Sequence, residues 1–92
     1  MALLSEPDIE QALSQLPGWE RAGAAIRKSF ARGDFTGAVE FASRLVEPAN
    51  EMNHHPDLEI SWETVTVTIS THSEGGLTAA DFELAGRVDA LA

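Results

Sequence analysis

Residues 58–70 of the chain read LEISWETVTVTIS, and apolar and polar side chains alternate along most of this stretch. The apolar positions are Leu58, Ile60, Trp62, Val65, Val67 and Ile69. A period of two is the pattern of a strand that buries one face. The link at Glu63-Thr64 is long enough only for a hairpin. We therefore expect two antiparallel strands, a half-buried one over 58–62 and a second one over 64–70.

A second pair of strands is predicted nearer the start of the chain. Residues 19–21 and 24–32 are both extended in pattern, and Ala22-Gly23 between them suits a turn. The second of these strands alternates poorly, because Lys28 falls on the same side as its apolar neighbours. The chain thus contains two hairpins, separated by about twenty-five residues of helical pattern.

Helices are predicted before, between and after the hairpins. The first follows Ser5, a suitable N-cap, and stops at Pro17-Gly18. The second follows Asp34, and its apolar stripe consists of Ala38, Phe41, Ala42 and Leu45. Pro48 either kinks this second helix or ends it, with a short helical turn through 50–53.

The last helix begins at Thr78, and Asp81 three residues later completes the pattern of a capping box. The element order is therefore helix, strand, strand, helix, strand, strand, helix. Paired strands of this kind predict an α+β fold, a two-layer sandwich in which three helices cover one face of a four-stranded antiparallel sheet. We expect residues 1–92 to form a single domain. Because open sheet edges need protection, we also expect a homodimer or homotetramer.

The charge balance argues against several classes of function. Fifteen acidic residues against six basic ones give a formal net charge of −9, and the basic residues are scattered. A protein that binds phosphates needs a basic face, so we expect neither direct nucleic-acid binding nor membrane attachment. The chain has no cysteine, which excludes disulfides and thiolate chemistry. Without a signal-like segment or a long apolar run, a cytoplasmic location is expected.

All three histidines of the chain, His54, His55 and His72, lie within residues 50–72. In a hairpin the start of the first strand lies beside the end of the second, so the three imidazoles should share one end of the sheet. Histidine exchanges protons near neutral pH, since its ordinary pKa is about 6.5. The cluster therefore suits general acid-base catalysis rather than covalent catalysis.

Other interpretations of these residues stay open. The histidines could be solvated loop residues and a strand cap, or a three-histidine metal site. A metal site is disfavoured because His54 and His55 are adjacent and would point in different directions from an extended loop. Helix capping alone is enough to explain Asp81. Glu51 and Asn53 could orient the histidines or end the helix.

The spacing of these residues closely resembles the signature of the pterin-4a-carbinolamine dehydratases. The resemblance rests on Asn53-His54-His55-Pro56, Trp62, Ser70-Thr71-His72 and Asp81, and it extends to Gly18-Trp19, Phe30, Asp34-Phe35 and Phe41. It therefore spans nearly the whole chain. The chain departs from the family pattern at Asn50, where an acidic residue is frequent, and at Pro48 inside the corresponding helix.

The resemblance implies the same fold in dimers or tetramers, and it implies an activity. That activity is dehydration of 4a-hydroxytetrahydropterin to the quinonoid dihydropterin, in recycling of a tetrahydrobiopterin-type cofactor, with no cofactor or metal required. The implied catalytic residues are His54, His55 and His72. The implied substrate-binding residues are Asn53, His54, His55, Ser70, Thr71 and His72, with possible support from Glu51, Trp62 and Asp81.

We hypothesise that His54 and His72 are the acid and the base and that His55 orients or binds the pterin. The alternative function is a non-catalytic module, because animal members of this family are also dimerisation partners of a transcription factor and some relatives serve in assembly. The presence of all three histidines favours catalysis.

Overall fold

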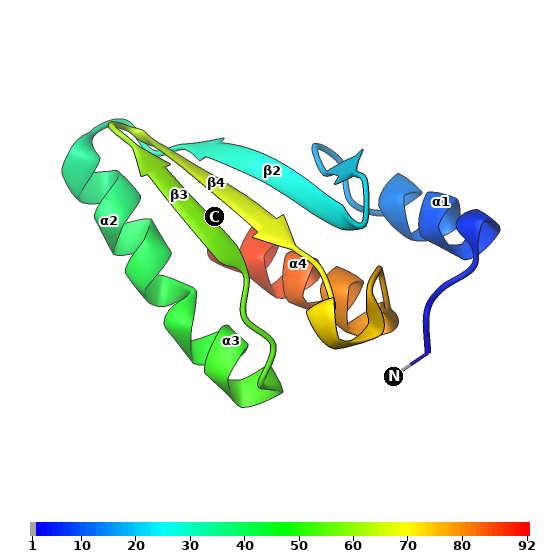
Figure 1. Ribbon diagram of the computed structural model, residues 1–92. Coiled ribbons are helices and arrows are strands. Elements are labelled where there is room, and N and C mark those ends of the chain that lie inside the picture. The colour runs from blue at the N-terminus through cyan, green and yellow to red at the C-terminus, as the bar shows by residue number, and fades with distance from the viewer. Residues whose placement is uncertain (1) are drawn as a thin grey trace.

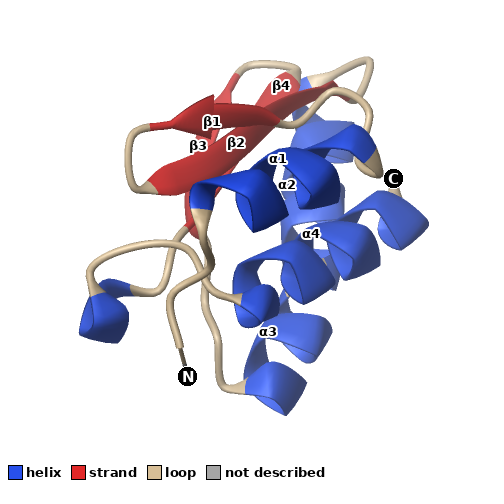
Figure 2. Cartoon of the chain, turned by 90° about the vertical axis from the view of Figure 1, so that its right-hand side faces the viewer, coloured by secondary structure: helices blue, strands red, loops and turns tan. Residues whose placement is uncertain are grey.

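Four antiparallel strands form one sheet in the order β1-β2-β4-β3 in the computed structural model, which describes residues 2–92 (Figure 1). The strands are β1 (Glu20–Ala22), β2 (Ala25–Ala31), β3 (Asp57–Ser61) and β4 (Thr64–Ile69). The helices are α1 (Glu6–Ser14), α2 (Phe35–Arg44), α3 (Val46–Met52), α4 (Ala79–Leu91) and a short 3₁₀ helix, η1 (His72–Glu74). The α-helices lie on one side of the sheet (Figure 2), so the predicted α+β fold is confirmed.

The helix starts follow the predicted capping residues. The Ser5 side chain accepts a hydrogen bond from the Asp8 N–H, and the Asp34 side chain accepts one from the Gly37 N–H. The second helix is interrupted at Leu45, and α3 restarts directly after it. Pro48 lies in the first turn of α3, where a missing N–H costs no helical hydrogen bond. The predicted break is therefore confirmed, although the second segment begins before residue 50.

The core lies between the helices and the inward face of β2 and β4. Its largest buried side chains include Ile26, Phe30, Phe41, Leu45, Val65, Val67, Ile69, Leu84 and Val88. The rings of Phe30 and Phe41 lie 5.0 Å apart between centroids, which joins β2 to α2. Lys28 also points to this side, and its ammonium donates to the Asp89 carboxylate and to the Pro17 carbonyl, both at 3.1 Å. That pairing explains the poor alternation of this strand.

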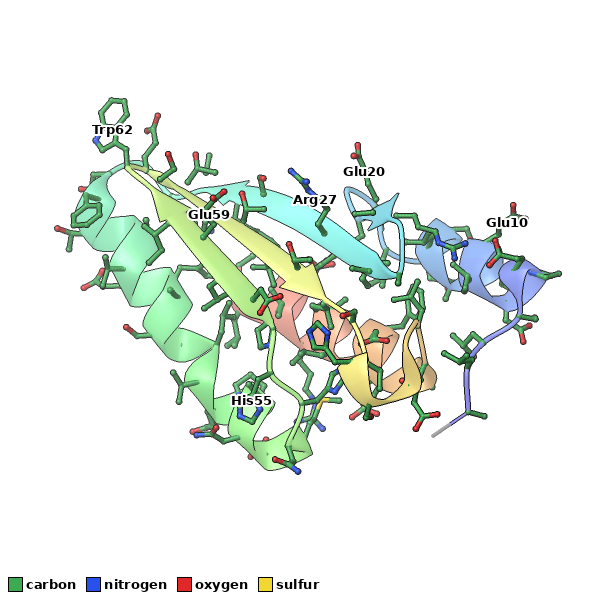
Figure 3. The ribbon with its side chains drawn as sticks, in the orientation of Figure 1. Glu10, Glu20, Arg27, His55, Glu59 and Trp62 are labelled. Atoms are coloured by element: carbon green, nitrogen blue, oxygen red, sulfur yellow. The ribbon has the colours of Figure 1, made fainter. Side chains whose placement is uncertain are left out.

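The hairpins differ from the sequence predictions in their turns. Ser61 pairs with Thr64, so the second turn consists of Trp62 and Glu63. Trp62 was expected in the strand, but it adopts a positive φ of 52° and is 71% exposed. It stands at the tip of the hairpin (Figure 3). In the first hairpin Ala22 pairs with Ala25, which shifts the turn one residue along the chain.

The prediction of a half-buried first strand in the second hairpin is wrong for this chain alone, because every residue of β3 is exposed. Leu58 and Ile60 pair with Val67 and Val65, so they belong to the helix-covered face. They remain about 40% exposed because β3 is the outermost strand and α2 covers it only in part. The other face carries polar side chains such as Glu59 and Arg27 (Figure 3).

Candidate active site

The side chain of His54 is anchored to the start of α4. It follows α3, whose C-cap, Asn53, adopts the left-handed conformation with a φ of 50°. This turn directs His54 across to α4, and the imidazole Nε2 lies 2.6 Å from Asp81 Oδ1. The His54 side chain is 14% exposed and that of Asp81 is 0% exposed. Asp81 is thus closed to solvent, and only part of the His54 imidazole ring remains exposed.

Asp81 has three hydrogen-bond partners in a buried network. Besides the His54 contact, its Oδ2 accepts from the Thr71 hydroxyl at 2.9 Å and from the Thr78 N–H at 2.8 Å. The hydroxyls of Thr71 and Thr78 are themselves 2.8 Å apart. Both hydrogen bonds at Oδ2 come from donors, which is the arrangement expected around an ionised carboxylate. Nε2 of His54 then carries the proton, and Nδ1 is the nitrogen able to exchange a proton with a bound molecule.

The interpretation of Asp81 as a capping residue is confirmed but incomplete. Both halves of the capping box with Thr78 are present. Only one carboxylate oxygen is used for that purpose, and the other holds His54. Sequence reasoning missed this contact because the two residues are 27 positions apart and capping already explained the aspartate. The contact could have been expected from the hairpin, which brings the loop of His54 beside the end of the second strand. The helix that follows His72 therefore has to start near His54.

His55 faces away from this network. Its Nε2 lies 3.0 Å from the Asn50 amide oxygen, and the residue sits beside α3 (Figure 3). It borders an apolar cavity of about 150 Å³ between α2, α3 and the start of β3. The cavity is lined by Ala42, Leu45, Val46, Ala49, Asn50, His55, Pro56 and Leu58. The two adjacent histidines therefore point in different directions, as expected, and they have different partners.

His72 lies in the loop that follows β4. The strand ends at Ile69, one residue before its predicted end, so Ser70 and His72 lie beyond the regular pleating. Instead His72 opens η1 and is exposed, while its neighbour Thr71 is 7% exposed. Because the Thr71 hydroxyl bonds to the partner of His54, the network brings the His72 loop next to His54. The Thr71 hydroxyl is used inside the protein, and its predicted contact with substrate stays a prediction.

The remaining predicted residues lie around α3. The Glu51 carboxylate accepts from Arg87 of α4 at 3.0 Å, and this exposed pair joins the two helices next to the histidine loop. Asn53 caps α3 through its backbone. Trp62 lies at the other end of the hairpin, away from the histidines (Figure 3). Within residues 2–92 no three His, Cys, Asp or Glu side chains are grouped to hold a metal ion, and no helix has the length and apolarity to span a membrane.

Comparison with known proteins places the chain in a family. The model of the family described as pterin 4 alpha carbinolamine dehydratase matches residues 2–91. The chain belongs to this family. A relative from Thermosynechococcus vestitus is 47% identical over 89 residues, which cover 97% of this chain and 94% of that protein. One from Nocardia farcinica is 46% identical over 90 residues, covering 98% and 95%. Both carry the name "Putative pterin-4-alpha-carbinolamine dehydratase".

Solved structures of the dehydratase family share the fold. A protein from Brucella melitensis described as a transcriptional coactivator/pterin dehydratase superposes with a TM-score of 0.93 at 34% identity, covering 99% of both chains. A pterin dehydratase-like protein identified as a RuBisCO assembly factor in the alpha-carboxysome superposes with a TM-score of 0.66 at 26% identity, covering 80% of this chain and 88% of that one. The resemblance inferred from the sequence is confirmed, and the fold is shared by proteins described in different roles.

Proposed function

We propose that this protein catalyses the dehydration of a 4a-hydroxytetrahydropterin. In this reaction the bond between C4a and its hydroxyl breaks, the oxygen leaves as water after gaining a proton, and the neighbouring ring nitrogen loses a proton as the C=N bond of the quinonoid dihydropterin forms. The observation that carries the proposal is the His54–Asp81 pair, which leaves one imidazole nitrogen free to exchange a proton. Membership of the family supplies the substrate class.

His54 and His72 are the two proton-transfer groups in this proposal. The reaction needs an acid at the leaving oxygen and a base at the ring nitrogen, and a positioned imidazole performs either role near neutral pH. Asp81 acts through His54 by fixing its orientation and the position of its proton. His55, beside the apolar cavity, orients the pterin. Ser70 and the side chain of Asn53 supply polar contacts to its edge. The reaction serves recycling of a pterin cofactor.

The direct test follows the decay of chemically generated 4a-hydroxytetrahydropterin with the wild-type protein and with His54→Ala and His72→Ala. Positioned acid-base groups contribute about 10²- to 10⁴-fold to a rate, so each variant is expected to lose at least about 10²-fold in kcat. Arg27→Ala, on the opposite face of the sheet, is the control and should retain full activity. Circular dichroism should be unchanged in all three variants, and full activity in both histidine variants would sink the assignment.

We further propose that the protein is a homodimer or homotetramer assembled through its exposed apolar side chains. We call these residues the edge surface: Phe35, Val39, Val46, Leu58 and Ile60, each at least 40% exposed. They lie on α2, α3 and the edge strand β3, which pairs with β4 on one side only, so a second copy would cover both the side chains and the free strand edge. Ile60→Lys is expected to yield monomers in analytical ultracentrifugation, whereas Glu59→Lys, on the opposite face of β3, should leave the assembly intact. A monomeric wild-type protein would contradict the proposal.

A second candidate function is a non-catalytic assembly module. It is favoured by the same edge surface and by the two structural relatives described as a coactivator/dehydratase and as an assembly factor. The two functions make opposite predictions for the decay assay. No acceleration by the wild-type protein, together with a defined protein partner that binds Ile60→Lys less well, would favour the module.

A further inference from the structure

The loop of residues 71–76, which carries His72, is closed mainly by its own backbone. Thr71 donates its N–H to the Gly76 carbonyl at 3.1 Å, and its carbonyl accepts from the N–H groups of Glu74 and Gly75, both at 3.0 Å. His72, Ser73 and Glu74 are exposed, so they bury little surface to fix the loop. Contacts from outside the loop therefore add to these backbone hydrogen bonds in setting the orientation of His72.

One external support is the segment before α1. The Leu4 N–H donates to the Leu77 carbonyl at 2.9 Å, directly after the loop, and the Leu4 side chain packs against the core. The Leu3 side chain lies over Gly76, where an added methyl group would be 3.0 Å from Leu3 Cδ2. The backbone of Gly76 is not in the left-handed region. Contact with Leu3, rather than backbone conformation, is what a side chain at this position would disturb.

The surroundings of this contact are otherwise open. A cavity of about 270 Å³ lies between the N-terminal segment, the β1–β2 turn and the loop, and Leu3, Leu4 and Gly76 are among the residues that line it. At its rim the Glu6 carboxylate and the Arg21 guanidinium form an ion pair at 2.7 Å, which ties the first turn of α1 to β1. The loop thus borders this cavity, and Leu3 and Leu4 line the part of the cavity next to the loop.

We propose that Leu3 and Leu4 are positioning residues for His72, so that the N-terminal segment sets the orientation of the loop. Their effect on turnover rests on the proposed dehydratase function, whereas their effect on the loop does not. A misplacement of a catalytic group by about 1 Å costs about 100-fold in rate. We expect loss of the single Leu3 contact to displace the loop by less than this and to lower kcat about tenfold.

The test uses Leu3→Ala, Gly76→Ala and the double variant of the full chain. The chain has three histidines, so NMR spectra can follow the imidazole signals of each one separately. Both single variants should change the His72 signals and leave those of His54 and His55 as in the wild type. The double variant should resemble Leu3→Ala alone, because the methyl group at position 76 then meets no leucine. Gly86→Ala is the control, since a methyl group there meets nothing within 4 Å.

Kinetics and stability complete the design. Leu3 is 55% exposed, so Leu3→Ala should change the Tm by no more than a few degrees. In the decay assay, run well below the Tm so that the variant is fully folded, it should lower kcat about tenfold with little change in KM. His72 signals unchanged in both single variants would overturn the proposal. Altered His72 signals in a protein without dehydratase activity would support the positioning role and count against the proposed function.

Discussion

Replacement of Asp81 by asparagine isolates the contribution of its charge to His54. The amide has the same shape as the carboxylate but has one acceptor oxygen and one donor nitrogen. The backbone N–H of Thr78 is a fixed donor, so the amide oxygen should take the position of Oδ2 and the NH₂ group should face His54. Nε2 of His54 must then accept, and the imidazole proton moves to Nδ1. The nitrogen that would exchange a proton with the substrate is therefore blocked.

The size of the effect follows from this change of tautomer. Acid-base groups contribute about 10²- to 10⁴-fold, and the equivalent change in the Ser-His-Asp triad lowers kcat by about 10⁴-fold. We expect Asp81→Asn to lower kcat by about 10²- to 10³-fold, because His72 is untouched. Asp81 is fully buried, so the altered network should also cost about 1–2 kcal/mol of unfolding free energy. For a domain of this size that lowers the Tm by about 4–16 °C.

The assay compares Asp81→Asn with Asp89→Asn at a temperature well below both Tm values. Asp89 lies on the same helix and accepts hydrogen bonds from the Trp19 indole and the Lys28 ammonium, each at 3.1 Å. Its replacement should reduce stability and leave kcat unchanged. The reasoning would be refuted if folded Asp81→Asn kept kcat within about threefold of the wild type, or if both variants lost activity equally.

Three further predictions concern the supports of the site. Asn53→Gly should keep the Tm, whereas Asn53→Ala should lower it, because the φ of 50° costs alanine about 1 kcal/mol. In steady-state kinetics, an equal rise in KM in both variants would show that the side-chain amide contacts the substrate. Thr71→Val should cost about 1–2 kcal/mol in denaturant unfolding, since Asp81 loses a buried donor, and unchanged stability would contradict the network. The hydrogen bond from Arg21 lowers the pKa of Glu6 below its ordinary 4.5. The pair therefore stabilises the fold above that pH and is lost as the pH falls through the lowered pKa. Glu6→Gln should lower the Tm slightly at pH 7, and this difference should shrink as the pH falls through the lowered pKa.

Much of the fold could be predicted because local patterns and tertiary structure agree. Ser5 and Asp34 cap the helices that they were expected to cap, and Val65, Val67 and Ile69 fill the core as their alternation indicates. The errors lie where tertiary context decides. Trp62 looked like a strand residue, but the pairing of Ser61 with Thr64 places it in the turn. Ile60 has a core-type pattern and remains exposed, because the amount of cover over an edge strand depends on neighbouring elements.

The site could be predicted in its residues and not in its contacts. The crowding of His54, His55 and His72 is visible in the sequence, and so is their spacing to Asp81. That Asp81 holds His54 follows only from the packing of the end of α3 against the start of α4. The inward direction of the Thr71 hydroxyl depends on the same packing. Contacts between residues far apart in sequence have no local pattern, so reasoning from spacing alone stops at the list of groups.

The most direct test of the central claim is the rate at which freshly generated 4a-hydroxytetrahydropterin loses water in the presence of the wild-type protein. The account predicts a saturable acceleration that falls at least about 10²-fold in His54→Ala. A wild-type protein that is folded, as judged by circular dichroism, and that leaves the spontaneous rate unchanged would contradict it.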